Sequence, residues 1–311
     1  MSDKKKKTKA GAQPGRVPEL RPGHYSDGHP LDQAHYLECK IILKGERFTS
    51  VQNFHEFSKL VAKAAEKSEV DFDTSEFEGL KPQIREVLFL DTKDFRLYNH
   101  AFILRRRITY EDGFLTGDPE MVFKFRHPDL QTAAEMDVRP HISGDYRVKF
   151  KAEALPLKEA IGSYRMLFSH NIEFPLSAVK EKDRNSMATL LRVLPALRTL
   201  TTSATDRVEL VNATAVEEVL LDIGMLDFGK GVEAKANTSV WRSRGDQKQL
   251  VGEFSFQCKF QRRDELHDKA LHRAKEFFCL LQRLAKDWVA LGTTKTGAVY
   301  RLKGNPPKAH E

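Results

Sequence analysis

The chain has 311 residues and a formal net charge of +7, and 40% of its residues are hydrophobic. This length and hydrophobic content support a packed core in one large or two small domains. No segment approaches the ~18 consecutive apolar residues that a membrane span needs, so we expect no membrane partner. The basic charge balance favours an anionic partner.

The two ends of the chain have the composition of disordered segments, and its cysteines bear on the cellular compartment. Residues 1–30 contain four consecutive lysines together with several Pro and Gly residues, which predicts a disordered basic arm. This arm could touch nucleic acid or anionic lipid, but we favour a solubilising tail, and we expect residues 303–311 to be disordered as well. No signal peptide follows the lysines. Cys39, Cys258 and Cys279 lack metal-site or disulfide spacing, which predicts reduced thiols in a cytoplasmic protein.

The first predicted strand covers residues 35–43 and carries charges on one face. Successive side chains of a strand point to opposite faces, so Glu38 and Lys40 share a face, opposite Leu37, Cys39 and Ile41. The same alternation recurs in residues 89–108, 121–126 and 253–260. An antiparallel sheet with one solvated face gives this pattern, and so does a closed sheet with a polar interior.

Helices are expected between and after these strands. Apolar spacing predicts a helix that begins near Phe48, with Thr49 or Ser50 at its start, and a long amphipathic helix over residues 264–291. Residues 140–200 indicate short helical stretches separated by prolines, and residues 200–227, 232–240 and 250–260 predict further strands. Many antiparallel strands with a few covering helices make an α+β fold.

The strand motifs resemble the CYTH domain of the triphosphate tunnel metalloenzymes. That family opens with Glu-x-Glu-x-Lys and continues with a Phe-Asp-Thr stretch and Leu-Arg-x-Arg; here the matching residues are 36–40, 90–92 and 104–107. The resemblance covers residues 34–302. It implies an eight-stranded antiparallel β-barrel, a tunnel, with covering helices. A closed barrel with a charged interior must hold water or a ligand, because isolated buried charges are costly.

The resemblance also implies a site. It assigns phosphate binding to Lys40, Arg105, Arg107, Lys124, Arg207 and Lys295. It assigns a divalent metal, Mg²⁺ or Mn²⁺, to Glu38, Asp222 and Glu253. Glu135 and Asp137 resemble an acidic pair on the following strand, whereas Asp91 is expected to cap a turn.

Three positions depart from the family pattern. Tyr36, Ser255 and Gln257 stand where the family has carboxylates, which weakens metal binding. Two hypotheses therefore remain: a metal-dependent triphosphatase, and a catalytically lapsed module that binds polyphosphate or a nucleotide. Inorganic triphosphate, a nucleoside triphosphate, thiamine triphosphate and longer polyphosphate are all open as ligands. RNA binding ranks last, because no basic strand carries interleaved aromatic residues, and we expect no nucleic-acid partner.

Overall fold

The computed structural model describes residues 17–203 and 205–303. Its helices are α1 (Val51–Lys67), α2 (Arg96–Asn99), α3 (Leu130–Glu135), α4 (Met187–Val193), α5 (Asp268–Leu284) and α6 (Lys295–Tyr300). Its strands are β1 (Tyr36–Leu43), β2 (Asp71–Asp73), β3 (Gln83–Asp91), β4 (Phe102–Glu111), β5 (Phe114–His127), β6 (Arg147–Pro156), β7 (Tyr164–Pro175), β8 (Glu209–Leu210), β9 (Val216–Asp227), β10 (Glu233–Ser243) and β11 (Gln249–Lys259). Among these residues, no helix has the length and apolar character to cross a membrane.

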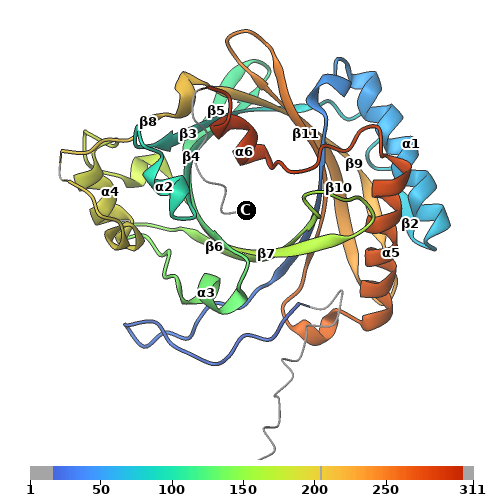
Figure 1. Ribbon diagram of the computed structural model, residues 1–311, viewed down its shortest axis with the longest axis horizontal. Helices are drawn as coiled ribbons and strands as arrows, with labels where there is room; N and C mark the ends of the chain where they lie inside the picture. The colour runs from blue at the N-terminus through green and yellow to red at the C-terminus, as the bar shows by residue number, and fades with distance from the viewer. Residues whose placement is uncertain (1–16, 204, 304–311) are drawn as a thin grey trace, which may run out of the picture.

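The strands close into a barrel around an open centre (Figure 1). The order around the ring is β9-β10-β11-β1-β6-β7-β5-β4-β3, and β3 pairs back with β9 to complete it. The predicted closed barrel is confirmed, although nine of the described strands form the ring where eight were expected. The pairing of β1 with β6 is parallel, and the other pairings of the ring are antiparallel.

The expectation of short helical stretches throughout residues 140–200 is wrong for the first half of that segment. Residues 147–175 form the hairpin β6–β7, and Pro156 and Pro175 are the last residues of these two strands. Every residue of β7 from Leu167 to Phe174 is buried. The period of two is present in β7, where Ser169, Asn171 and Glu173 alternate with largely apolar side chains, but the prolines of the segment favoured short helical stretches.

Helices α1 and α5 lie side by side and cover the outer face of one part of the barrel (Figure 1). Phe57 of α1 packs on Phe254 of β11 with ring centroids 5.7 Å apart, and Phe277 of α5 packs on Phe256 at 5.5 Å. Helix α1 begins directly after Ser50, as expected. The three cysteines are buried free thiols. This core uses the outward-facing side chains, which leaves the alternate positions of β1 and β11 for the interior.

A second apolar cluster covers the opposite part of the barrel. Leu97 of α2 and Leu190 of α4 are buried against Leu104, Phe123 and Phe174, which lie on β4, β5 and β7. Figure 1 shows α2 and α4 on the side of the ring away from α1 and α5. Both clusters lie outside the ring, so the strands are held in shape from the outside and their inward faces are free for other side chains.

One end of the barrel interior is filled by a third apolar cluster. Phe89 and Ile103 point inward from β3 and β4 and are buried with Trp241 of β10 and with Tyr300 of α6. The rings of Phe89 and Tyr300 lie 6.0 Å apart between centroids. Helix α6 lies within the outline of the ring in Figure 1. The tunnel is therefore closed by packed side chains at this end.

Asp91 joins this cluster to the end of β3. Its carboxylate accepts hydrogen bonds from the backbone N–H groups of Thr92, Leu97 and Tyr98 at 2.7 to 2.9 Å, and from the hydroxyl of Tyr300 at 3.0 Å. The prediction that Asp91 caps a turn is confirmed. The same carboxylate also holds the last residue of α6 in place.

Part of the predicted disordered N-terminal arm, residues 17–30, is ordered in the structure. Residues 1–16 lie outside the described part of the chain, but residues 17–30 pack on the barrel. Val17 and Tyr25 are buried, and the hydroxyl of Tyr25 donates to the carbonyl of Ala134 at 3.0 Å. These apolar side chains anchor a segment whose composition resembles that of a disordered arm. Of the predicted C-terminal tail, residues 304–311 also lie outside the described residues.

Candidate anion-binding site

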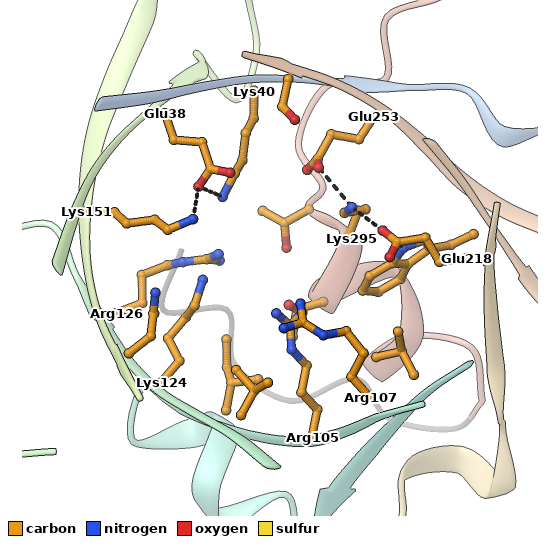
Figure 2. A pocket seen from close by; sticks show the side chains of 18 of the residues that line it. Glu38, Lys40, Arg105, Arg107, Lys124, Arg126, Lys151, Glu218, Glu253 and Lys295 are labelled. Atoms are coloured by element: carbon orange, nitrogen blue, oxygen red, sulfur yellow. Dashed lines mark hydrogen bonds and ion pairs between the residues drawn. The ribbon is translucent and has the colours of Figure 1, made fainter. Parts of the chain in front are cut away.

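The half of the barrel interior that α6 leaves open contains a cavity of about 230 Å³ (Figure 2). Among the described residues, its charged lining consists of nine Lys and Arg and four Glu: Lys40, Arg85, Arg105, Arg107, Lys124, Arg126, Lys149, Lys151, Lys295, Glu38, Glu173, Glu218 and Glu253. The structure brings seven of the residues named from the sequence together in this cavity: Glu38, Lys40, Arg105, Arg107, Lys124, Glu253 and Lys295. The cavity is rich in cations, as a polyanion site requires.

Two of the residues named from the sequence lie elsewhere. Arg207 forms an ion pair with Asp183 on the outer surface and is more than half exposed, so its expected place in the tunnel is wrong. It precedes the short strand β8, which pairs with β3 outside the ring. Asp222 lies on β9, where Lys235 of β10 pairs with it at 2.7 Å, and it does not reach the cavity. The nearest acidic lining residue on that strand is Glu218.

Glu153 is the fully buried carboxylate at the centre of one cluster. Its Oε1 lies 3.0 Å from Lys40 Nζ and 3.3 Å from Lys124 Nζ, and it accepts a hydrogen bond from Ser169 Oγ at 2.7 Å. Its Oε2 lies 3.2 Å from Arg126 Nε. Burial acts to raise the pKa of Glu153, but the charges of Arg126, Lys124 and Lys40 outweigh it and hold that pKa well below its usual range. Glu153 is therefore an anion that holds three of the cavity's cations in place.

Glu38 forms the neighbouring pair. Its Oε2 lies 2.9 Å from Lys40 Nζ and 3.1 Å from Lys151 Nζ, as the dashed lines in Figure 2 show. β1 and β6 place Glu38 directly beside Glu153. The ammonium of Lys40 thus contacts both carboxylates. Burial lowers the pKa of Lys40, but the charges of Glu153 and Glu38 outweigh it and raise that pKa above its ordinary value.

A second lysine has the same kind of environment across the cavity. Lys295, the first residue of α6, places its Nζ 3.0 Å from Glu218 and 2.9 Å from Glu253 (Figure 2). The indole N–H of Trp241 donates to Glu218 at 2.8 Å, and Arg85 pairs with the other oxygen of Glu218 at 2.8 Å. Burial acts to raise the pKa of Glu218, but Lys295 and Arg85 hold it well below its usual range.

The two arginines of β4 differ in their partners. Arg107 pairs with Glu120 and lies 3.5 Å from Glu173. Arg105 has no hydrogen-bond or ion-pair partner among the described residues, and its Nε is buried without an acceptor. Burial, followed by the repulsion of Arg107, lowers the pKa of Arg105 to about 10. Arg105 is therefore a charge in the cavity wall with no direct counter-ion.

The three departures from the family motif all have polar roles in the lining or at its edge. Gln257 accepts a hydrogen bond from Lys151 at 2.8 Å, and the Lys151 ammonium lies 5.7 Å from the ring centroid of Tyr36. Ser255 donates to the side chain of Asn237 at 3.0 Å. Neutral groups thus take the positions of the expected carboxylates, so the cavity keeps more of its positive charge.

Sequence reasoning missed Lys151 and Arg126 in the cavity lining and the fully buried Glu153 that pairs with the cavity's cations. Residues 149, 151 and 153 alternate with Phe and Ala, the same signal that identifies β1, but the prolines of the segment favoured a helical interpretation. Arg126 follows Lys124 in phase on β5. The acidic pair expected at Glu135 and Asp137 is wrong, because that segment ends α3 and lies outside the barrel.

The cavity carboxylates do not fit a Mg²⁺ or Mn²⁺ site. Glu253 lies opposite Ile42 in the β1–β11 register, so its backbone is about 13 Å along the strand direction from that of Glu38, and the two carboxylates bind different lysines. The closer pairs, Glu38 with Glu153 and Glu218 with Glu253, each have a lysine ammonium between them. Across the described ranges, no group of three or more His, Cys, Asp and Glu could hold a metal ion.

Comparisons with known proteins give distant structural likenesses. No model of a protein family matches the sequence, and no curated protein matches it. The fold is similar to that of an adenylyl cyclase candidate from Hippeastrum, described as having a dominant triphosphatase activity, at 13% identity and a TM-score of 0.40, over 88% of this chain and 98% of that one. It is also similar to an adenylate cyclase candidate from Bacillus halodurans, at 12% identity and a TM-score of 0.37, over 84% and 95% of the two chains. Likenesses this distant carry no argument about ligand or activity.

Proposed function

We propose that this protein binds a triphosphate or another short polyphosphate in the barrel cavity. The observation that carries the proposal is Arg105, a partly buried guanidinium with no counter-ion among the described residues in a cavity with a large excess of cations. Burying an unpaired charge costs folding free energy, so its presence is best explained by a ligand that supplies the missing negative charge.

The chemistry of the lining suits phosphate oxygens. A guanidinium can bind two oxygens of a phosphate at once, and ammonium groups add charge without a fixed geometry. Arg105 and Arg107 enter from β4, Lys124 and Arg126 from the adjacent strand β5, and Lys151 from β6, which lies beyond β7 in the ring (Figure 2). A linear anion of several phosphates can contact both groups, which a single carboxylate cannot do. The resemblance of the strand motifs to the CYTH domain supports the same ligand class.

The pairing of the cavity carboxylates supports a binding module over the alternative, a metal-dependent triphosphatase. Hydrolysis through a divalent metal requires carboxylates that are free to coordinate it. Glu38, Glu153, Glu218 and Glu253 are each paired with at least one lysine. A phosphate-release assay over tripolyphosphate and nucleoside triphosphates, with and without Mg²⁺ and Mn²⁺, distinguishes the two functions. Turnover at ordinary enzyme rates of ~1–10³ per second would decide for the enzyme.

Calorimetric titration with tripolyphosphate tests the binding itself. Arg105→Gln should weaken binding by about 1.5–3 kcal/mol, because one charge-assisted hydrogen-bonding group is lost. Arg106→Gln is the matched control: Arg106 is next on the same strand but faces outward and donates to Asn185. It should leave the affinity unchanged. Absence of binding to the parent protein, or equal affinities of parent and Arg105→Gln, would refute the proposal.

A further inference from the structure

Two lysine ammonium groups lie between pairs of carboxylates in the cavity. Lys40 contacts Glu38 and Glu153, and Lys295 contacts Glu218 and Glu253. We infer that these lysines are built-in counter-cations in the positions where a divalent metal would have to bind, so that the cavity recognises its polyanion without a metal ion. This inference rests on the proposed function only in naming the polyanion; the occupation of the two positions is a property of the protein alone.

Lys295 has the more complete set of contacts. Besides its two carboxylates, its Nζ lies 3.3 Å from Ser239 Oγ and 4.8 Å from the centroid of the Trp241 ring. An ammonium is stabilised by such an aromatic face as well as by anions. Two carboxylates, a hydroxyl and an aromatic ring therefore surround one cation. A metal ion at this position would first have to displace the ammonium.

The backbone keeps Lys295 at this position. Helix α6 is fixed at its end by the Tyr300 hydroxyl, which donates to buried Asp91, and by Asn212, whose side chain donates to the carbonyls of Val299 and Tyr300 at 2.7 and 3.0 Å. Thr294 caps the start of the helix by accepting the N–H of Gly297 at 3.0 Å. With both ends held, the lysine stem enters the cavity from a fixed point.

Lys40 is held in a similar way from the opposite wall. Its two carboxylates are neighbours in the β1–β6 register, so their separation is set by the spacing of adjacent strands. Glu153 is fully buried and also paired with Lys124 and Arg126. Strong attraction to these anions raises the pKa of Lys40, so the ammonium keeps its charge throughout the neutral pH range.

The inference predicts that Mg²⁺ affects ligand binding in the opposite direction from its effect in a metalloenzyme. In a metal-dependent site, Mg²⁺ bridges the carboxylates and the phosphates and thus strengthens binding. Here the positive charge belongs to the protein, and Mg²⁺ that binds tripolyphosphate in solution only lowers the charge of the ligand. Excess Mg²⁺ should therefore weaken tripolyphosphate binding, and a chelator should not reduce it.

The test is a Mn²⁺ titration of the full chain without phosphate, with free Mn²⁺ followed by electron paramagnetic resonance. The parent protein should show no saturable Mn²⁺ site in the cavity. Lys295→Met, which removes the ammonium but keeps a similar volume, should gain a saturable Mn²⁺ site that is roughly tenfold or more tighter than any residual Mn²⁺ binding by the parent, since two carboxylates become available. Glu253→Gln added to this variant should abolish the gain.

Two results would overturn the inference. The first is saturable Mn²⁺ binding by the parent protein that disappears in Glu253→Gln. This result can be observed even if the lysine variant does not fold. The other is a folded Lys295→Met, checked by circular dichroism, that gains no Mn²⁺ affinity. A separate tripolyphosphate titration in a chelator and in excess Mg²⁺ tests the proposed function: no binding in either condition rejects that function, whereas binding only with Mg²⁺ rejects the inference.

Discussion

The two halves of the barrel interior are built from the same strands but have opposite chemistry. On β1 the inward positions are Glu38 and Lys40 at one end and Ile42 at the other, and on β4 Ile103 precedes Arg105. The apolar half is a packed core that closes the tunnel, whereas the charged half remains open as a cavity. The change occurs within two residues along each strand, so a continuous barrel can combine a core and a ligand site.

The comparison shows that the apolar half positions part of the charged half. It holds α6 inside the ring, and α6 carries Lys295 to the cavity wall. The charged half places buried ions near one another, which stabilises a fold weakly or not at all. We therefore expect folding stability to depend on the apolar half and on a few buried carboxylates, and ligand affinity to depend on the unpaired cations.

The largest expected effect concerns the apolar half. Phe89→Ala removes a fully buried ring that packs on Trp241 and Tyr300, and it should lower the free energy of unfolding by about 3–5 kcal/mol. Phe114→Ala is the control, because Phe114 is 77% exposed at a hairpin and its loss should stay within about 0.5 kcal/mol. Guanidinium unfolding measures both. Similar stabilities of the two variants would mean that the apolar half is not a stabilising core.

A somewhat smaller loss is expected from the charged half. Glu153→Gln removes the buried anion shared by Lys40, Lys124 and Arg126, and should lower the free energy of unfolding by about 3 kcal/mol. Tripolyphosphate should restore part of this loss, because a ligand that binds only the folded state stabilises it. Glu135→Gln is the matched control, because this side chain is exposed at the end of α3. If tripolyphosphate shifted the unfolding of the Glu153 variant and of the parent equally, the cluster would not belong to the ligand site.

The smallest effect is a pH dependence of affinity. The pKa of Arg105 is lowered to about 10, so its charge is present below that pH and is lost above it. Because an anionic ligand favours the charged form, affinity should fall as the pH rises, by roughly twofold at the pKa, where half of the guanidinium groups are neutral. Burial also lowers the pKa of Lys124, so this lysine loses charge at high pH as well. Calorimetry of the parent and of Arg105→Gln separates the contribution of Arg105 to the pH dependence from that of Lys124. Identical pH profiles would exclude Arg105 as the titrating group.

Much of the site is predictable because alternation along a strand is a local property. The period of two in β1, β4, β5 and β11 is enough to put Lys40, Arg105, Lys124 and Glu253 on the polar faces of their strands. The same reasoning, applied to β5 and β6, also finds Arg126, Lys151 and Glu153. The errors have other causes: prolines at the ends of β6 and β7 favoured a helical interpretation of that segment, and the expected place of Arg207 rested on motif likeness alone.

The sequence by itself determined the strands with two-faced character, the two long covering helices and the excess of basic side chains, because each of these depends on neighbours within one segment. Only the tertiary structure decided that β3 closes onto β9, that β1 lies parallel to β6, and that α6 enters the barrel. These contacts join residues far apart in the chain. They also decide which charges are paired, since Lys295 meets Glu218 and Glu253 only after the barrel has closed around α6.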